Sequence, residues 1–282
     1  MEEFIQIEQI DEATQAVVSR TTVCPQVGII LGSGLGGVAD LVKDAVTIPF
    51  EQIPHWPVST IGGHSGKLIV GNLGGTPVMV MQGRVHYYEG YSMSQVTLPI
   101  RVMQRMGITT LIITNAAGAI NPNLMPGDVM LIQDHIALVT MGGMNPLRGP
   151  NLDEFGVRFP DMSQPYHRGL MDVARQVAME KNIPLQQGVY AGLAGPSFES
   201  PADLRFLHII VADAVGMSTV PEVIVANHGR MKVLGLSGIS NKANLDGSTV
   251  TTHEEVLAAG KLIVPKLQDL IVGVLEKLVR QS

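Results

Sequence analysis

A glycine-rich loop carrying one hydroxyl is the first feature of the chain that could do chemistry. The apolar run 27–31 leads into "GSGLGG" (32–37), with Ser33 near its middle. Backbone N–H groups and a serine hydroxyl can surround an oxyanion, so the loop suits the pyrophosphate of a dinucleotide or a single phosphate. A tight turn without any ligand is the alternative for such a loop.

The residues beyond the loop separate these possibilities. A dinucleotide fold places an Asp or Glu at the end of its second strand, about 20 residues after the glycines. The segment there, "TIPFEQIPHWP" (47–57), contains Glu51, but its three prolines argue against a regular parallel strand. The sequence therefore favours a single phosphate.

Two further segments offer donors for a phosphate. In "QGRVHYYEGY" (82–91), Arg84 and His86 are two residues apart and fall on one side of an extended segment. Arginine provides a planar fork for phosphate oxygens, although a solvated surface charge is the alternative for Arg84 alone. In "TNAAGAI" (114–120) small side chains at a strand end let the backbone approach a ligand, or serve close strand–helix packing.

The overall composition narrows the class of protein. The 282 residues are 45% hydrophobic and 16% charged, carry a net charge of −6 and include one cysteine, Cys24. These values predict a large buried core, argue against nucleic acid as a partner, and exclude an internal disulfide or a cysteine metal cage. The acidic start of the chain does not resemble a signal peptide, and no apolar run reaches about 18 residues. We expect a cytoplasmic globular protein that does not enter membranes.

Alternating strands and helices position these motifs. The alternation predicts an α/β fold with a sheet covered on both faces, in a single domain over 1–282, with the Gly/Pro-rich stretch 141–165 as a long functional loop. Pro265 should kink or divide the last helix. The expected helices cover 3–20, the end of the glycine loop to about 43, 94–107, 165–182, 201–209, about 220–229 and the chain from 252; the expected strands cover 27–31, two segments within 67–83, 109–119, 186–193, 213–216 and 232–240.

The combination of motifs resembles the family of trimeric, low-molecular-mass purine nucleoside phosphorylases. The resemblance runs from about residue 26 to 278 and rests on "LGSGLG", "GRVHYYEGY", "TNAAG", "GDVMLIQDHI", "NPLRGPN", "AGPSFESP", "DAVGMSTVPE" and "HEEVLAAGK". It implies a central mixed, partly barrel-like sheet flanked by helices. It also implies cleavage of purine nucleosides by orthophosphate, giving free base and pentose 1-phosphate, with no metal or redox cofactor.

The resemblance also implies a role for individual residues. For phosphate it implies Ser33, His64, Arg84, His86, the backbone N–H of Ala116, and Ser218. For the purine it implies Phe198, Glu199, Val215, Gly216 and Asn241. For the ribose it implies Tyr88, Tyr190, Met217, His253 and Phe159, the last reaching in from a neighbouring subunit of a homotrimer. Asn241, His86 and Glu199 are the expected catalytic residues.

The chemistry explains why such residue types are needed. Breaking an N-glycosidic bond leaves positive charge on the sugar and negative charge on the purine, and an amide such as Asn241 can donate to the departing ring. A carboxylate at Glu199 can accept from N1–H of guanine or hypoxanthine but faces a lone pair in adenine, which predicts 6-oxopurine substrates. Each residue has a local alternative: a first-turn helix charge for Glu199 and a turn former for Asn241.

Three other functions compete with this interpretation. A methylthioadenosine phosphorylase favours 6-aminopurines and usually carries Asp at the position of Asn241. A nicotinamide-dependent dehydrogenase is disfavoured, because the acidic residue expected at the end of its second strand is missing. A nucleoside-binding module without turnover would carry the same phosphate donors and stays open. One departure from the family pattern is Val211, where relatives usually have glycine; it predicts a different local turn close to Val215.

Overall fold

A computed structural model of the chain describes residues 4–60, 65–243 and 252–281. Its helices are α1 (Ile7–Val18), α2 (Met93–Arg105), α3 (Leu138–Met141), α4 (Arg168–Glu180), α5 (Pro201–Ile209), α6 (Val220–His228) and α7 (His253–Gln281). Its strands are β1 (Val27–Leu31), β2 (Lys43–Pro49), β3 (Lys67–Leu73), β4 (Thr76–Gln82), β5 (Thr110–Ala119), β6 (Val129–Ile136), β7 (Leu185–Gly192), β8 (Ala214–Gly216) and β9 (Lys232–Lys242).

The sheet is open at one end and closed at the other. Its strand order is β2-β3-β4-β1-β5-β8-β7-β6-β9, and β9 also pairs with β5. This last pairing closes β5, β8, β7, β6 and β9 into a ring, while β1 to β4 extend from it as an arm. The expected α/β class with a mixed, partly barrel-like sheet is confirmed.

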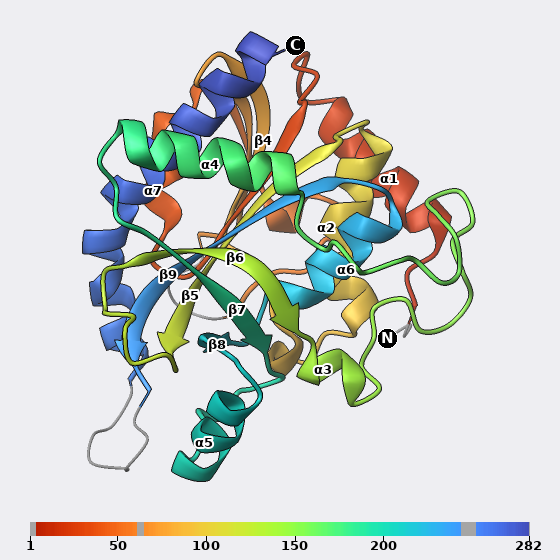
Figure 1. Ribbon diagram of the computed structural model, residues 1–282. Helices are drawn as coiled ribbons and strands as arrows, with labels where there is room; N and C mark the ends of the chain where they lie inside the picture. The colour runs from red at the N-terminus through yellow and green to blue at the C-terminus, as the bar shows by residue number, and fades with distance from the viewer. Residues whose placement is uncertain (1–3, 61–64, 244–251, 282) are drawn as a thin grey trace.

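Helices cover the sheet on both sides (Figure 1). α4 and α7 lie together on one side, and α1, α2 and α6 lie on the other, whereas α5 projects away from the ring. The strands between the layers are apolar: all five residues of β1 are buried, and most of β5 is buried too. Such continuous burial is typical of a strand covered on both faces.

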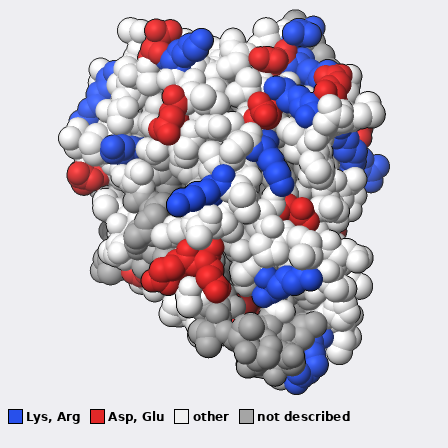
Figure 2. All heavy atoms as spheres, turned by 90° about the vertical axis from the view of Figure 1, so that its left-hand side faces the viewer, with Lys and Arg blue, Asp and Glu red and all other residues white. Residues whose placement is uncertain are grey.

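The surface carries charges of both signs. Lys and Arg side chains are interspersed with Asp and Glu over the face shown in Figure 2. Among the residues described, no helix is long and apolar enough to cross a membrane.

The structure differs from the sequence-based prediction at two strands, β2 and β6. The glycine loop is followed by a 3₁₀ turn (Gly36–Leu41) and then by β2, so the helix expected up to about residue 43 is wrong. β2 pairs antiparallel with β3 at the sheet edge and ends at Pro49, a place where proline costs no ladder bond. β6 was not expected either, and it pairs with both β7 and β9.

Two expectations about the backbone meet the structure differently. α7 continues from His253 to Gln281 with Pro265 inside it, so the proline does not divide this helix, and a kink at Pro265 stays a prediction. Val211 keeps the left-handed conformation that a glycine would adopt, with φ of 62°, instead of forming a different turn. A β-branched side chain is strained in that region, so the end of α5 stores backbone strain.

Candidate active site

The glycine loop is held between β5 and α7. The backbone N–H of Gly32 donates to the Thr114 hydroxyl at 3.1 Å. On the other side, a Cβ placed on Gly260 of α7 would lie 2.5 Å from the carbonyl oxygen of Gly34, so only glycine allows the helix to pack this closely. The loop therefore has a fixed position, and it presents Ser33 half-buried at the end of β1.

Arg84 follows β4 and is almost fully buried, with 2% of its surface exposed. Its Nη1 donates to a carboxylate oxygen of Glu222 at 3.1 Å and to the Thr219 hydroxyl at 3.4 Å. Its Nη2 donates to the carbonyl oxygen of Thr114 on β5. Two segments far apart in the sequence, β5 and the start of α6, thus fix one guanidinium, and the surface-charge alternative for Arg84 does not hold.

A tight turn links this arginine to Ser218. Thr219 has φ of 72° and ψ of −53°, and the Val220 N–H donates to the Ser218 carbonyl oxygen at 2.7 Å. Together these values define a γ-turn of the rare, strained kind. The Thr219 hydroxyl accepts from Asn115 Nδ2 at 2.9 Å and lies 3.2 Å from the Ser218 hydroxyl. The turn places Ser218 beside Arg84 and β5.

His86 is oriented by Glu89. The Glu89 carboxylate accepts from the His86 backbone N–H at 2.8 Å, lies 3.0 Å from Nδ1 of the ring, and accepts from the Thr60 N–H at 2.8 Å. Burial opposes ionisation of this carboxyl, but the hydrogen bonds from His86 and Thr60 outweigh it and lower the pKa of Glu89 to about 2. A charged carboxylate consequently fixes the ring of His86, which stacks on Tyr88 with centroids 4.9 Å apart.

A small cavity joins the two groups of side chains. It measures about 10 Å³, and its lining includes His86, Met217, Ser218 and Glu222. Met217 also approaches Tyr88, because a Cβ on Gly195 would lie 2.4 Å from the Met217 sulfur and 2.9 Å from the Tyr88 ring. The expected ribose residues Tyr88 and Met217 therefore lie next to the expected phosphate residues His86 and Ser218.

Asn241 lies at the far end of β9, beside β5 and β8. Its side chain contacts Gly118, where a Cβ would lie 3.4 Å from Asn241 Nδ2 and 3.6 Å from a Val215 methyl. Its Oδ1 accepts from the Ser240 hydroxyl at 2.8 Å. Gly118 is two residues beyond Ala116 on β5, so the ends of these three strands bring Asn241 and Val215 to the edge that also holds Ala116.

Phe198 and Glu199 precede α5, which begins with Ser200 as a cap bonded to Asp203. Phe198 is 48% exposed. Glu199 is half-buried, and burial raises the pKa of its carboxyl, assisted by the nearby charge of Asp203. The structure thus shows Phe198 exposed and Glu199 half-buried at the start of α5, and their contact with a purine stays a prediction.

The other predicted residues are placed differently. Tyr190 is fully buried, and its hydroxyl accepts from the Ser218 N–H at 3.3 Å, so it supports the γ-turn from inside the protein. A Cβ on Gly216 would lie 2.4 Å from the same hydroxyl. His64 and the side chain of His253 fall outside the described residues, although His253 begins α7.

Phe159 stands apart from the other predicted residues on the surface. It belongs to the loop between α3 and α4, is 88% exposed, and borders an open cavity of about 680 Å³. A second open cavity, of about 810 Å³, is bordered by Tyr88 and Gly195. The predicted ribose residues of one chain thus lie beside open space, and Phe159 of the same chain does not fill the cavity that Tyr88 borders.

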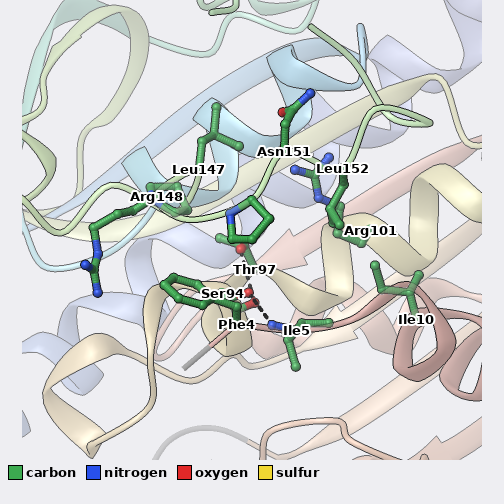
Figure 3. A pocket seen from close by; sticks show the side chains of 12 residues that line it. Phe4, Ile5, Ile10, Ser94, Thr97, Arg101, Leu147, Arg148, Asn151 and Leu152 are labelled. Atoms are coloured by element: carbon green, nitrogen blue, oxygen red, sulfur yellow. Dashed lines mark hydrogen bonds between the residues drawn. The ribbon is translucent and has the colours of Figure 1, made fainter. Parts of the chain in front are cut away.

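The loop that carries Phe159 is anchored to α1 and α2. A cavity of about 30 Å³ lies between the loop and these helices. Leu147, Arg148, Asn151 and Leu152 of the loop line it on one side, and Phe4, Ile5, Ile10 and the α2 residues Ser94, Thr97 and Arg101 line it on the other (Figure 3). Buried Arg101 contacts His228 at 3.0 Å, and His228 contacts Asn151 at 3.1 Å. The predicted functional loop is therefore tied to the helices beneath it.

Sequence reasoning missed four polar residues of this region: Glu89, Asn115, Thr219 and Glu222. The spacing of His86 and Glu89 was a signal for an i, i+3 pair, and a Glu in the apolar segment "TVPEVIVA" was a signal for a buried charge. The positive φ of Thr219 could not be predicted, because threonine does not favour that backbone conformation. Within the described residues, no group of three or more His, Cys, Asp or Glu could hold a metal ion.

Comparison with known proteins identifies the family. The model of the phosphorylase superfamily matches residues 26–276. Purine nucleoside phosphorylase 1 of Bacillus subtilis is 50% identical over 250 residues, which cover 89% of this chain and 91% of that protein.

The chain belongs to the phosphorylase superfamily. Solved structures of Schistosoma mansoni purine nucleoside phosphorylase match throughout, at 42% identity and a TM-score of 0.93. The complex with inosine covers 98% of this chain and 99% of its own chain, and the complex with adenosine covers 99% of each. The match over nearly the whole of both chains shows that this chain and these enzymes share one fold.

Proposed function

We propose that this chain is an enzyme of purine salvage that cleaves 6-oxopurine nucleosides with orthophosphate. Inosine, guanosine and their 2′-deoxy forms are the substrates, and the products are the free base and pentose 1-phosphate. The observation that supports this most directly is the buried guanidinium of Arg84, fixed beside Ser218 against Thr114 of β5, the strand that also contacts Asn241 at Gly118. In the proposed site one strand thus carries a cationic group for the phosphate and a carboxamide for the purine, which phosphorolysis requires.

In the proposed reaction phosphate is the nucleophile. An oxygen of phosphate forms a bond to C1′ as the bond from C1′ to the purine nitrogen breaks, and the purine leaves with the bonding electrons. The phosphate is held by the side chains of Ser33, Arg84, His86 and Ser218 and by the backbone N–H of Ala116. His64 provides a further contact to it. The negative charge of the phosphate stabilises the positive charge that develops on the sugar. The chain needs no nucleophile of its own, and positioning supplies much of the rate.

On the opposite side of the sugar, the purine becomes negative as it leaves. Asn241 donates to the ring near N7 and O6, and this bond strengthens as charge develops. Glu199 accepts from N1–H, while Phe198, Val215 and Gly216 surround the ring. Tyr88, Met217 and His253 hold the sugar, and buried Tyr190 contributes through the turn at Ser218.

The proposal includes the form in which the enzyme works. Phosphate is a co-substrate, no metal or redox cofactor takes part, and the setting is the cytoplasm. The active form is a homotrimer in which Phe159 of one subunit enters the site of the next. Its 88% exposure and the open cavity beside Tyr88 support this arrangement. Light scattering of the active enzyme tests it, and an active monomer would contradict it.

Release of hypoxanthine from inosine, measured with and without phosphate, tests the proposed reaction. We expect cleavage that depends on phosphate and yields ribose 1-phosphate. Cleavage at a rate independent of phosphate would indicate a hydrolase. Binding of inosine without cleavage would indicate a nucleoside-binding module. Either outcome overturns the proposal.

A second candidate is activity on 6-aminopurine nucleosides. It is favoured by the adenosine complex of the similar Schistosoma mansoni enzyme. It is opposed by Asn241, which donates well to a 6-oxo group, and by the carboxyl of Glu199. Comparing kcat/KM for inosine, adenosine and methylthioadenosine decides between the two, and we expect inosine to be preferred.

A further inference from the structure

Behind Arg84 lies a carboxylate that the proposed reaction does not use. Glu222 is in the first turn of α6, with 3% of its surface exposed, and one of its oxygens accepts from Arg84 Nη1 at 3.1 Å. Its other oxygen has no hydrogen-bond partner among the described residues. The neighbouring α6 residues Val220, Val223 and Ile224 are buried and apolar.

This pair is costly to the fold. Removing two charges from water costs several kcal/mol for each, and well-packed apolar side chains in place of a buried ion pair are often at least as stable. An idle carboxylate oxygen adds to that cost. The pair is therefore better explained by what it does to Arg84 than by a contribution to stability.

The geometry around Arg84 indicates what that is. Glu222 and Thr219 both contact Nη1, whereas the carbonyl oxygen of Thr114 accepts from Nη2. The guanidinium is thus fixed from α6 and from β5 at once. Thr219 occupies this place at the expense of a strained γ-turn, which is the kind of strain that collects at functional sites.

We propose that Glu222 is a positioning residue for the phosphate subsite. Through its bond to Nη1 it holds the Arg84 guanidinium in the orientation that binds phosphate, and Thr219 completes the support. The inference rests on the proposed function, in which Arg84 binds the co-substrate. We infer that the length of the Glu222 side chain matters most, because it places an acceptor oxygen at Arg84 Nη1. The negative charge of that oxygen matters less.

Two substitutions separate reach from charge. Glu222→Gln keeps the length of the side chain and an oxygen that can accept from Nη1, but it removes the charge. Glu222→Asp keeps the charge and withdraws it by one methylene. Glu180→Asp makes the same shortening in the exposed pair of Glu180 with Lys277 and serves as the matched control.

The KM for phosphate and the KM for inosine are measured for each variant, together with binding of inorganic sulfate by titration calorimetry. We expect Glu222→Asp to raise the phosphate KM and the sulfate Kd about ten-fold, because misplacing a donor weakens a bidentate anion contact. Glu222→Gln should stay within about three-fold of the wild type, since the hydrogen bond to Arg84 is retained. The inosine KM should change by less than about two-fold in both variants, because Glu222 is hydrogen-bonded to Arg84 and to none of the residues proposed to hold the nucleoside.

The reverse order, with Asp behaving like the wild type and Gln impaired, would assign Glu222 to charge balance and overturn the proposal. So would equal changes in the phosphate and inosine constants, which indicate a general loss of structure. If the wild type fails to cleave inosine, the proposed function fails. The sulfate titrations still show whether Glu222 positions an anion-binding arginine.

Discussion

The phosphate side and the base side of the candidate site differ in how firmly their residues are held. Arg84, Thr219 and Glu222 are each at most 3% exposed and are joined to one another by hydrogen bonds. Phe198 is 48% exposed, and Asn241 and Glu199 are half-buried. In the proposed reaction, phosphate, the co-substrate common to every nucleoside, meets Arg84 in this buried hydrogen-bonded group, whereas the purine meets side chains that are more exposed.

This difference has a physical reason. Fixed donors stabilise developing charge without having to reorganise during the reaction, so rigidity benefits the phosphate side most. Discrimination between purines depends on which polar groups of the base or the protein are left without a hydrogen-bond partner. A few side chains determine this. Substitutions on the phosphate side should consequently lower all activity, and substitutions on the base side should change the choice of substrate.

The largest effect is expected at Arg84. Arg84→Lys keeps a positive charge but loses the planar fork that contacts Thr114, Thr219 and Glu222. We expect kcat/KM for phosphate to fall about a hundred-fold or more with every nucleoside, as when one fixed donor is removed from an anion site. Steady-state kinetics with inosine and guanosine measure it.

The control for Arg84 is Arg105→Lys. Arg105 is a half-buried surface arginine paired with the exposed Asp11 and Glu154, and such surface pairs contribute little. Activity within about two-fold of the wild type is expected for this variant. If Arg84→Lys were equally harmless, the rigid support would have no part in the reaction.

On the base side, Asn241→Asp should change selectivity. A carboxylate accepts where the amide donated, so it opposes the 6-oxo group and suits the 6-amino group of adenine. We expect the ratio of kcat/KM for adenosine to that for inosine to rise about ten-fold or more. An unchanged ratio would place the carboxamide away from the base.

A smaller change in selectivity is expected at Glu199. Glu199→Gln provides an N–H that can donate to N1 of adenine, so the preference for inosine over adenosine should fall about five- to ten-fold. Asp203→Asn removes a nearby charge in the first turn of α5 and should alter the preference by less than about two-fold. Equal effects of the two variants would show that only the local charge matters.

The smallest effect is expected at Val211, an exposed residue with a strained backbone just after α5. Val211→Gly removes a β-branched side chain from a φ of 62°, and it should raise stability by about 1 kcal/mol. Thermal unfolding should show a Tm increase of about 2 °C. Val211→Ala keeps a Cβ in the strained conformation and should gain less; a Tm for Val211→Gly at or below that of the wild type would contradict the strain.

The comparison also explains what could be predicted from sequence. Arg84 and His86 are close in the chain, and apolar runs such as 27–31 and 109–119 identify buried strands, so these features follow from local patterns. The contact of Asn241 with Gly118, by contrast, depends on β9 pairing with β5 along its whole length. That pairing is a long-range property, and the family resemblance, not residue spacing, led to Asn241.

Other features had no usable local signal. β2 contains a proline and lies at an edge, so its composition resembles a loop, and the polar second half of β6 obscured a strand. The pairing of Glu222 with Arg84 is a long-range contact, and only the structure shows it. Val211 and Thr219 adopt backbone conformations that their side chains disfavour, because packing around them outweighs local preference.

A crystal structure with sulfate and inosine bound tests the central claim most directly. We expect sulfate oxygens at about 2.7–3.2 Å from the Arg84 guanidinium and the Ser218 hydroxyl, the ribose between sulfate and base, and Asn241 Nδ2 directed at the purine. A sulfate bound away from Arg84, or a carboxamide turned from the ring, would contradict the account.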